Sequence, residues 1–337
     1  MFSQKIDVII PAYNAQKTIL RTIASILTQD IVDDLEVTIV NDGDEIGYVE
    51  IVKMFSPYLS IREIKLNENQ GPGAARQFGI ENTKNPLITF IDADDTFAGA
   101  FSLKTLRQNL LNDPKVVCCW SSFLEDQKDV YVKHSLDTTW MFGKLYKRSF
   151  IDKYNIHFPP NSRSNEDGAF NTLCRLYMND NENINMIEDV TYYWHYKEDS
   201  ITRVNNAEYS YKDSFSGYTE NQIWAIKEAE KIVPFNGEVM KQKVMVLCNL
   251  YEYYLETKRS DPRYEERNWG YCKLFYKEIY REIKHKISEK VLSDVYNSVM
   301  YNAYLSQRMN GIMPKLGFLE FLEKLEQECI EEDSHKL

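Results

Sequence analysis

Three aspartates follow an apolar run in the stretch LITFIDADDTF, residues 87–97, where Asp92, Asp94 and Asp95 stand within four positions. Carboxylates this close repel one another, and burying them without a partner costs free energy. Asp92 and Asp94 are two residues apart, with Ala93 between them, so both can point to one side of a strand end. Hard divalent cations bind through one or two such carboxylates together with substrate phosphates. The spacing predicts a metal and diphosphate site, with an acidic surface turn as the alternative.

Another aspartate follows an apolar run in TIVNDGD, where Asp42 is the first acid. A carboxylate in this place can accept a hydrogen bond from the imide N–H of a uracil, which a neutral acceptor does less well. The alternative is a turn aspartate that binds the backbone near it.

The elements that must position these acids alternate between strand and helix patterns over residues 6–97. Apolar β-rich runs occur at IDVIIPAYN, LEVTIVNDGD, LSIREIKL and PLITFIDADD, and helical patterns at QKTILRTIASILTQ and GPGAARQFGIENT. This order predicts an α/β fold of the Rossmann-like type, a largely parallel sheet flanked by helices. Ligands of such sheets sit beyond the carboxyl ends of the strands. Residues 11–14, 41–44 and 92–95 fall at those ends, so we expect them to converge on one edge.

The second half of the chain has a different character. Residues 98–203 are less regular, and long, tyrosine-rich helical patterns begin near residue 208. Apolar residues in these patterns recur at helical spacing, as in Val244, Leu247, Tyr251 and Leu255. We therefore expect a catalytic domain over residues 1–207 and an all-helical domain over residues 208–337. The helical domain could bind an acceptor or join subunits into a homo-oligomer.

Composition restricts the partners. The net charge of −11 argues against general binding to nucleic acid, which depends on clustered Lys and Arg. No apolar run approaches the ~20 residues that span a bilayer, and the N-terminus lacks the pattern of a signal peptide. We expect a cytoplasmic protein, with peripheral association with a membrane left open. The six cysteines are expected to be reduced and structural.

Taken together, three blocks resemble the nucleotide-binding half of a family-2 glycosyltransferase with the GT-A fold. The blocks are VIIPAYNAQKTILRTIASILTQ, VTIVNDGD and NQGPGAARQFGIENTKNPLITFIDADDTF, and the resemblance extends over roughly residues 5–205. It implies a nucleotide site, a metal site for Mn2+ or Mg2+, and a catalytic base. For the nucleotide it indicates Pro11, Ala12, Tyr13, Asn14 and Asp42; for the metal and diphosphate, Asp92, Ala93 and Asp94; for the base, Asp167 with Glu166 beside it.

The acids of SNEDGAF suit two roles. In sugar transfer with inversion, one carboxylate takes the proton from the acceptor hydroxyl. Asp167 is the candidate, and Glu166 would orient it or bind the acceptor. The same residues suit a helix start, with Ser164 or Asn165 as the cap and the acids in the first turn. Both roles are compatible, because acids at a helix start are held rigidly.

The resemblance implies further contacts. His195 in YYWHYKEDSIT stands where the family can place a ligand of the metal or diphosphate, although an isolated histidine is more often structural. Arg76, Lys197 and Arg203 could neutralise phosphate. Lys144 falls where the family often has a basic residue near donor or acceptor, with plain surface charge as the alternative.

Two positions depart from the family pattern. Gln16 stands where an acid is common, and Asp44 stands where serine is common. These departures concern the details of nucleotide contact and do not touch the metal element or the base.

The sequence thus predicts a metal-dependent, inverting glycosyltransferase that moves a hexosyl or N-acetylhexosaminyl group from a UDP-sugar to a hydroxyl. A surface polysaccharide, a teichoic-acid-like polymer or a lipid-linked glycan is the expected acceptor. Two alternatives stay open. A sugar nucleotidyltransferase would carry a Gly-rich, basic phosphate loop after the first strand, and PAYNAQKT is not one. A non-catalytic module that binds nucleotide sugars or glycans would lack the carboxylates.

Overall fold

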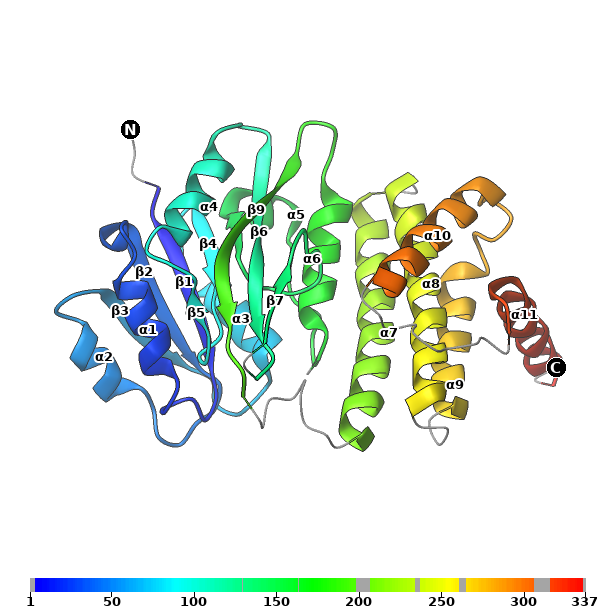
Figure 1. Cartoon of the computed structure of the whole chain (residues 1–337), viewed down its shortest axis with the longest axis horizontal. Coiled ribbons are helices and arrows are strands. Elements are labelled where there is room, and N and C mark those ends of the chain that lie inside the picture. Colours follow the sequence, from blue (N-terminus) through cyan, green and yellow to red (C-terminus); the bar gives the residue numbers. More distant parts are fainter. Residues whose placement is uncertain are drawn as a thin grey trace. The chain divides into compact units, whose positions relative to one another are not determined.

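The computed structural model describes residues 4–128, 130–162, 164–197, 207–233, 237–260, 265–305 and 316–335. The chain divides into two compact units, Met1–Glu198 and Asp199–Leu337, which are described separately (Figure 1). The domain boundary expected at residue 207 stays a prediction, because residues 198–206 lie outside the described part. Arg203 lies in the same gap.

Unit 1 alternates strands and helices in its first half and is mostly β in its second half. Its strands are β1 (Ile6–Ala12), β2 (Leu35–Asn41), β3 (Ser60–Lys65), β4 (Leu87–Phe90), β5 (Thr96–Phe97), β6 (Val116–Asp126), β7 (Tyr131–His134), β8 (Lys144–Lys147) and β9 (Asn183–Trp194). Its helices are α1 (Ile19–Leu27), the 3-10 turn η1 (Val32–Asp34), α2 (Val49–Phe55), α3 (Pro72–Glu81), α4 (Ser102–Leu111), α5 (Arg148–Tyr154) and α6 (Glu166–Tyr177).

These strands form one sheet in the order β3-β2-β1-β4-β8-β6-β9-β5, and β7 pairs with β6 (Figure 1). Neighbouring strands from β3 to β4 are parallel, while β8 is antiparallel to both β4 and β6. In the register, Ala12 lies opposite Asn41, and Ile9 lies opposite Phe90. The segments that follow β1, β2 and β4 therefore leave the sheet at the same edge, as the sequence predicts.

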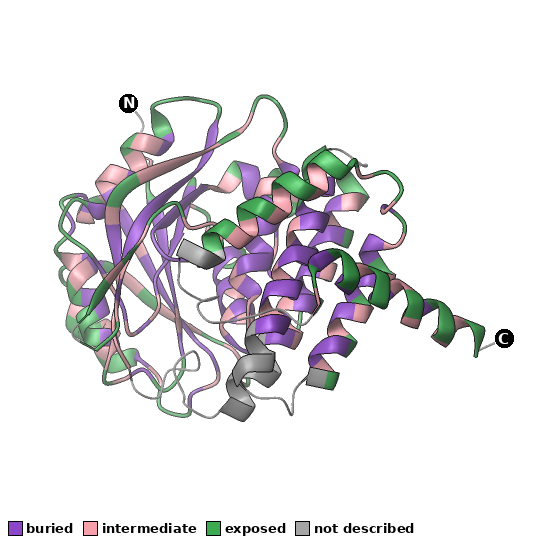
Figure 2. Cartoon of the chain, turned by 45° about the vertical axis from the view of Figure 1, so that its right-hand side comes forward, coloured by how far each residue is buried: buried purple, intermediate pink, exposed green. Residues whose placement is uncertain are grey.

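Apolar periodicity accounts for the layers. The side chains of β1 from Ile6 to Ile10 are buried, as expected for a strand covered on both faces. Helix α1 lays Ile19, Ile23 and Ile26 against the sheet, each fully buried. Burying each such side chain contributes about 1.5–3 kcal/mol. In Figure 2 the central strands are largely purple, and green lies mainly on loops and on the outer parts of helices.

Helix α3 begins in a way that depends on two glycines. Gly71, its N-cap, has φ +92°, a backbone conformation that residues with a Cβ rarely adopt. Pro72 follows at the first helical position, which suits its fixed φ. Gly73 lies so close to α6 that an added Cβ would stand 2.9 Å from Cγ of Glu166. The glycines thus let α3 approach the acids of α6 closely.

Unit 2 is helical. Its elements are α7 (Ala207–Ile232), α8 (Gly237–Ser260), α9 (Glu265–Phe275), the π-helical turn η3 (Tyr276–Tyr280), α10 (Glu289–Leu305) and α11 (Phe318–Ser334). It has a hydrophobic core of its own, in which Phe321 and Leu325 of α11 pack with Tyr251 of α8 and Trp269 of α9. The fold class predicted from the sequence, an α/β sheet flanked by helices and followed by a helical region, is confirmed. The sheet is mixed, however, because β4 and β6 pair antiparallel with β8, and β5 and β7 also pair antiparallel with their neighbours.

Acidic residues of α11 face a row of bases on α9, η3 and the turn after it. Lys273 contacts Glu332 at 2.6 Å, Arg281 contacts Asp333 at 2.6 Å, and Lys284 pairs with Glu326. Part of the negative charge of this helix is therefore neutralised within unit 2.

Two further features bear on the expectations from composition. The six cysteines are buried, and none is joined to another. In the parts of the chain that the structure describes, no helix combines the length and apolar character that crossing a bilayer requires.

Candidate active site

The turn after β4 separates its three aspartates. Asp92 and Asp94 keep 29% and 33% of their side-chain surfaces exposed, whereas Asp95 is buried. Asp95 accepts hydrogen bonds from the hydroxyl of Tyr192 at 2.7 Å and from the backbone N–H of His195 at 2.9 Å. Burial raises the pKa of Asp95 well above its ordinary value, and the neighbouring Asp92 and Asp94 add to this. Asp95 thus ties the turn to β9, whereas Asp92 and Asp94 stay partly exposed.

Asp92 and Asp94 form a donor set that fits a divalent cation. Burial raises the pKa of Asp94, and the negative charge of Asp92 raises it further. Lys197 opposes this shift, with its ammonium 3.5 Å from Asp94. A cation would stabilise the ionised form of Asp94 beside Asp92. Mg2+ and Mn2+ bind through one or two carboxylates together with substrate phosphates. Among the described residues, no group of three or more His, Cys, Asp or Glu side chains is placed to hold a metal ion by itself.

His195 lies beside this turn. Its Nε2 atom is 2.9 Å from Oγ1 of Thr96. Burial lowers its pKa to about 4, and the charge of Arg21 acts in the same direction. The ring is therefore neutral near pH 7, which is the state that binds metals. Its role as a ligand stays a prediction.

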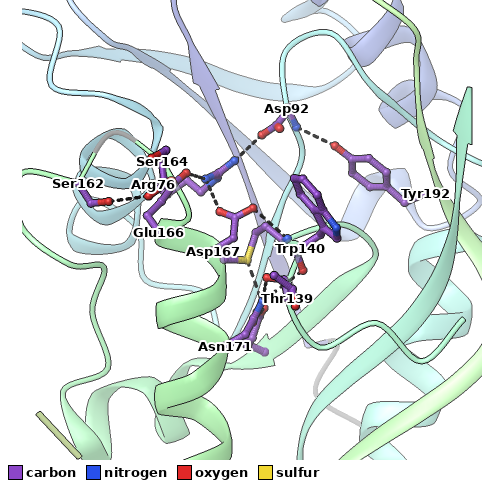
Figure 3. A network of polar contacts seen from close by, with 12 residues as sticks. Arg76, Asp92, Thr139, Trp140, Ser162, Ser164, Glu166, Asp167, Asn171 and Tyr192 are labelled. Atoms are coloured by element: carbon purple, nitrogen blue, oxygen red, sulfur yellow. Dashed lines mark hydrogen bonds and ion pairs between the residues drawn. The ribbon is translucent and has the colours of Figure 1, made fainter. Parts of the chain in front are cut away.

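Arg76 joins the metal element to the predicted base (Figure 3). Its Nη2 atom donates to Asp92 at 2.7 Å, and its Nη1 atom donates to Glu166 and Asp167 at 2.8 Å each. The guanidinium is buried, and these three carboxylates keep its pKa well above the ordinary value despite burial. In the structure Arg76 is a bridge between acids, whereas the sequence indicated a residue that neutralises phosphate.

Asp167 is held on both sides in the first turn of α6. One carboxylate oxygen contacts Arg76, and the other accepts the backbone N–H of Met141 at 3.1 Å (Figure 3). Burial raises its pKa to about 8; Arg76 opposes this rise, and the charge of Glu166 adds to it. A carboxyl with a pKa near the working pH is suited to general base catalysis. Asn165, one of the two predicted caps, stands at the N-cap position of α6, but its side chain makes no capping hydrogen bond.

The segments after β1 and β2 lie next to each other at the sheet edge. The backbone N–H of Asp42 donates to the carbonyl of Ala12 at 2.9 Å. Tyr13 exposes 52% of its surface, and Asn14 is exposed as well. Pro11 is half-buried within β1, while Ala12 and Ala93 are buried. Tyr13 and Asn14 are therefore the accessible members of the predicted nucleotide site in this loop.

Asp42 takes the turn role that was considered as its alternative. It is buried, and its carboxylate accepts the backbone N–H groups of Gln70 and Gly71 at 2.8 and 2.9 Å. It thus stabilises the start of α3, as the turn alternative expects. Contact of this carboxylate with a base N–H stays a prediction.

Lys144 is not the surface charge considered as its alternative role. Its side chain is fully buried, and its ammonium donates to the carbonyl of Asp137 at 3.1 Å. It lies 5.0 Å from the ring centroid of Trp120. Burial lowers its pKa, and the charges of Asp137 and Asp167 oppose this shift. In the structure Lys144 fixes the loop that leads to Met141 and so to Asp167; contact with the donor stays a prediction.

The sequence did not indicate two residues of this network. Asn171 donates from its amide to the carbonyl of Thr139 at 2.9 Å and accepts the hydroxyl of Tyr146 at 2.7 Å. It stands four residues after Asp167 on α6, and this spacing could have indicated it. Tyr192, which orders Asp95, had no comparable signal.

A mixed α/β sheet whose strands β1 to β4 are parallel, with acidic side chains gathered at one edge, is the arrangement of the GT-A class of transferase folds. Residues 7–164 match the model of Glycosyl transferase family 2, so this region of the chain is similar to that family.

Curated relatives are glycosyltransferases by name. TarS of Staphylococcus aureus, a poly(ribitol-phosphate) beta-N-acetylglucosaminyltransferase, is 28% identical over 56% of this chain and 35% of its own length. A poly(ribitol-phosphate) beta-glucosyltransferase of Bacillus spizizenii is 26% identical over 67% of this chain and 37% of its own. EpsH of Bacillus subtilis is 27% identical over 47% of this chain. The chain spans about half of EpsH (52%) and about a third of TarS.

Solved structures confirm the fold. Residues 1–349 of Staphylococcus aureus TarS in complex with UDP-GlcNAc align with a TM-score of 0.65 and 17% identity, covering 90% of this chain and 92% of that one. The mannosyltransferase PcManGT of Pyrobaculum calidifontis, in complex with GDP-Man and Mn2+, aligns with a TM-score of 0.55 and 13% identity, covering 97% of this chain and 87% of that one.

Proposed function

We propose that the chain is a metal-dependent, inverting glycosyltransferase that moves a sugar from UDP to a hydroxyl. The observation that carries this proposal is the network around Arg76, which joins Asp92 of the metal element to Asp167 across 2.7 and 2.8 Å contacts. The proposed base and the proposed diphosphate site are thereby held next to each other. A binding module without catalysis has no need of a buried carboxylate whose pKa is raised to about 8.

In the proposed reaction, Asp167 accepts the proton of the acceptor hydroxyl as that oxygen attacks the anomeric carbon. Arg76 and the N–H of Met141 hold the carboxylate in place during this transfer. Asp92 and Asp94 would hold Mn2+ or Mg2+, which acts as a Lewis acid that stabilises the departing diphosphate. Attack and departure on opposite faces of the sugar give inversion.

The relatives and the loop after β2 support the choice of donor and acceptor. We propose Asp42 as the acceptor for the N–H of a uracil, and the related fold of TarS has been solved with UDP-GlcNAc. Two relatives act on poly(ribitol phosphate) by name, which supports a teichoic-acid-like polymer as acceptor; a surface polysaccharide or lipid-linked glycan remains in the same class. The proposal covers transfer of a hexosyl or N-acetylhexosaminyl group. The cytoplasmic location stays a prediction.

We also propose that the helical unit binds the acceptor or joins subunits. Its separate hydrophobic core supports a role independent of the nucleotide site.

The proposal is tested by release of UDP. The purified full chain is incubated with Mn2+ and a panel of UDP-sugars, alongside Asp94→Ala, Asp167→Asn and the control Asp33→Asn, which changes an exposed acid outside the site. We expect slow hydrolysis of one donor that both site variants abolish and the control retains. Absence of UDP-sugar turnover and binding, with and without metal, would refute the nucleotide assignment.

A further inference from the structure

A buried carboxylate faces the loop after β1, and the proposed reaction does not use it. Asp44 lies two residues beyond Asp42 and exposes 4% of its surface. Both of its carboxylate oxygens accept the backbone N–H of Asn14, at 2.9 Å each. The hydroxyl of Tyr48 donates to it at 2.5 Å, and the side-chain amide of Gln16 donates at 3.1 Å. Asp44 therefore collects donors from three residues, two of which lie in the loop after β1.

Each of these donors is uncharged. Within the described residues, the contacts of Asp44 include no Lys, Arg or His. A buried carboxylate is costly unless hydrogen bonds compensate it, and hydrogen bonds to an ionised acceptor are about twice as strong as neutral ones. The charge of Asp44 thus acts by strengthening its hold on the loop and not by forming an ion pair.

The loop turns at Asn14, whose φ of +52° lies in the left-handed region that asparagine enters more readily than most residues with a Cβ. The next amide, that of Ala15, donates to the hydroxyl of Tyr48 at 3.2 Å. Asp44 and Tyr48 thereby fix two successive amides directly after the exposed ring of Tyr13.

Asp44 is itself fixed to the sheet. Its backbone N–H donates to the side chain of Asn41 at 2.7 Å, and Asn41 donates in turn to Glu63 at 2.8 Å. The other oxygen of Glu63 accepts the backbone N–H of Tyr48 at 2.9 Å. This circuit connects the loop after β1 to β2 and β3, so the carboxylate is a fixed point against which the loop is placed.

We propose that Asp44 is a positioning residue for nucleotide recognition. Its carboxylate holds Tyr13–Gln16 against the segment that contains Asp42, so a nucleobase meets the ring of Tyr13 and the carboxylate of Asp42 already in place. The proposal rests on the proposed function, since it concerns the same nucleotide site. A binding loop that is already ordered increases affinity, because binding then does not pay the entropy of ordering it.

Three variants of the full chain separate this role from general stability. Asp44→Asn keeps the size of the side chain, removes its charge and brings an amide donor against the donors of Asn14 and Tyr48. In the double variant that adds Gln16→Glu, the amide of residue 44 can donate to the carboxylate of residue 16, which reverses the direction of the wild-type hydrogen bond. Glu45→Gln is the matched control, because it removes an exposed charge one residue further along.

Two measurements are made on each variant with Mg2+ present. Calorimetry gives the dissociation constants of UDP and CDP, whose bases differ at the N3 position that Asp42 would contact. Hydrogen exchange of the ligand-free chain reports the amides of Asn14 and Ala15. For Asp44→Asn we expect at least tenfold weaker binding of UDP, a smaller preference for UDP over CDP, and faster exchange at both amides. The double variant with Asp44→Asn and Gln16→Glu should recover part of the UDP affinity, of the preference for UDP and of the amide protection. Glu45→Gln should match the wild type in all three.

The outcomes distinguish this inference from the proposed function. Suppose that the wild type binds UDP, and that Asp44→Asn and Glu45→Gln have the same UDP affinity, the same preference for UDP over CDP and the same exchange rates at the two amides. This result overturns the positioning role alone. Equal loss of UDP and CDP affinity, with unchanged exchange at the two amides, also overturns it. Wild-type protein that binds no nucleoside diphosphate refutes the proposed function and the positioning role together.

Discussion

The raised pKa of Asp167 predicts how the rate depends on pH. A general base acts only in its deprotonated form, and burial raises the pKa of this carboxyl to about 8. With that value, about one tenth of the carboxyls is ionised at pH 7 and about nine tenths at pH 9. The value of kcat/KM for UDP release should therefore rise about tenfold between pH 7 and pH 9 and then level off.

Replacing Glu166 by glutamine gives the sign of this effect a direct test. The charge of Glu166 raises the pKa of Asp167, and Glu166 shares Nη1 of Arg76 with it. Glu166→Gln removes the repelling charge and leaves the guanidinium more available to Asp167. The rise in rate should then begin at lower pH, so the ratio of the rate at pH 7 to the plateau increases.

The assay measures kcat/KM for UDP release from pH 6 to pH 9.5 with saturating Mg2+, and the affinity for UDP is measured separately at each pH. Asp33→Asn is the control and should follow the wild-type curve. A rate that does not change across this range, or a curve that Glu166→Gln moves to higher pH, would refute the assignment of Asp167 as the base.

Three further predictions concern the same site. Arg76→Met leaves three carboxylates without their cation and should lower the free energy of unfolding by about 3–5 kcal/mol, as for other broken buried ion pairs. The control Arg107→Met breaks a partly exposed pair with Asp34 and should lower it by at most about 1 kcal/mol. Equal shifts of the two melting temperatures would contradict this prediction. Gly73→Ala places a Cβ against Glu166 and should reduce kcat about tenfold while UDP still binds, since small displacements in a site cost at least this much. Removing divalent cations with EDTA should abolish UDP release and Mn2+ should restore it; full activity in EDTA would exclude the metal role of Asp94.

The edge of the sheet could be predicted from the sequence because its signals are local. Apolar runs that end in Asp42 and Asp92 indicate both the strands and the place where the acids emerge. The network around Arg76 could not be predicted in the same way. Its partners stand 16, 90 and 91 residues away along the chain, so only the folded topology brings them together.

Lys144 shows a second limit of local patterns. Lysine is seldom fully buried, so surface charge was a reasonable alternative. The neighbours Phe142, Leu145 and Tyr146 are buried, and the short strand carries the lysine into the interior with them. Its compensation comes from Asp137 and the ring of Trp120, which become visible as partners only when β6 and β8 pair.

Helix α3 has a mechanical consequence for the molecule. At its start, the amides of Gln70 and Gly71 are bound by Asp42, and five residues beyond Gly71 its Arg76 holds Asp167. The helix thus connects the proposed nucleobase contact, Asp42, at its start with the proposed proton acceptor, Asp167, along its side. If an ill-fitting nucleobase displaced Asp42, helix α3 would move with it and shift Asp167, the proposed general base. Engineering a new donor preference without loss of turnover therefore requires changes that leave the axis of α3 where it is.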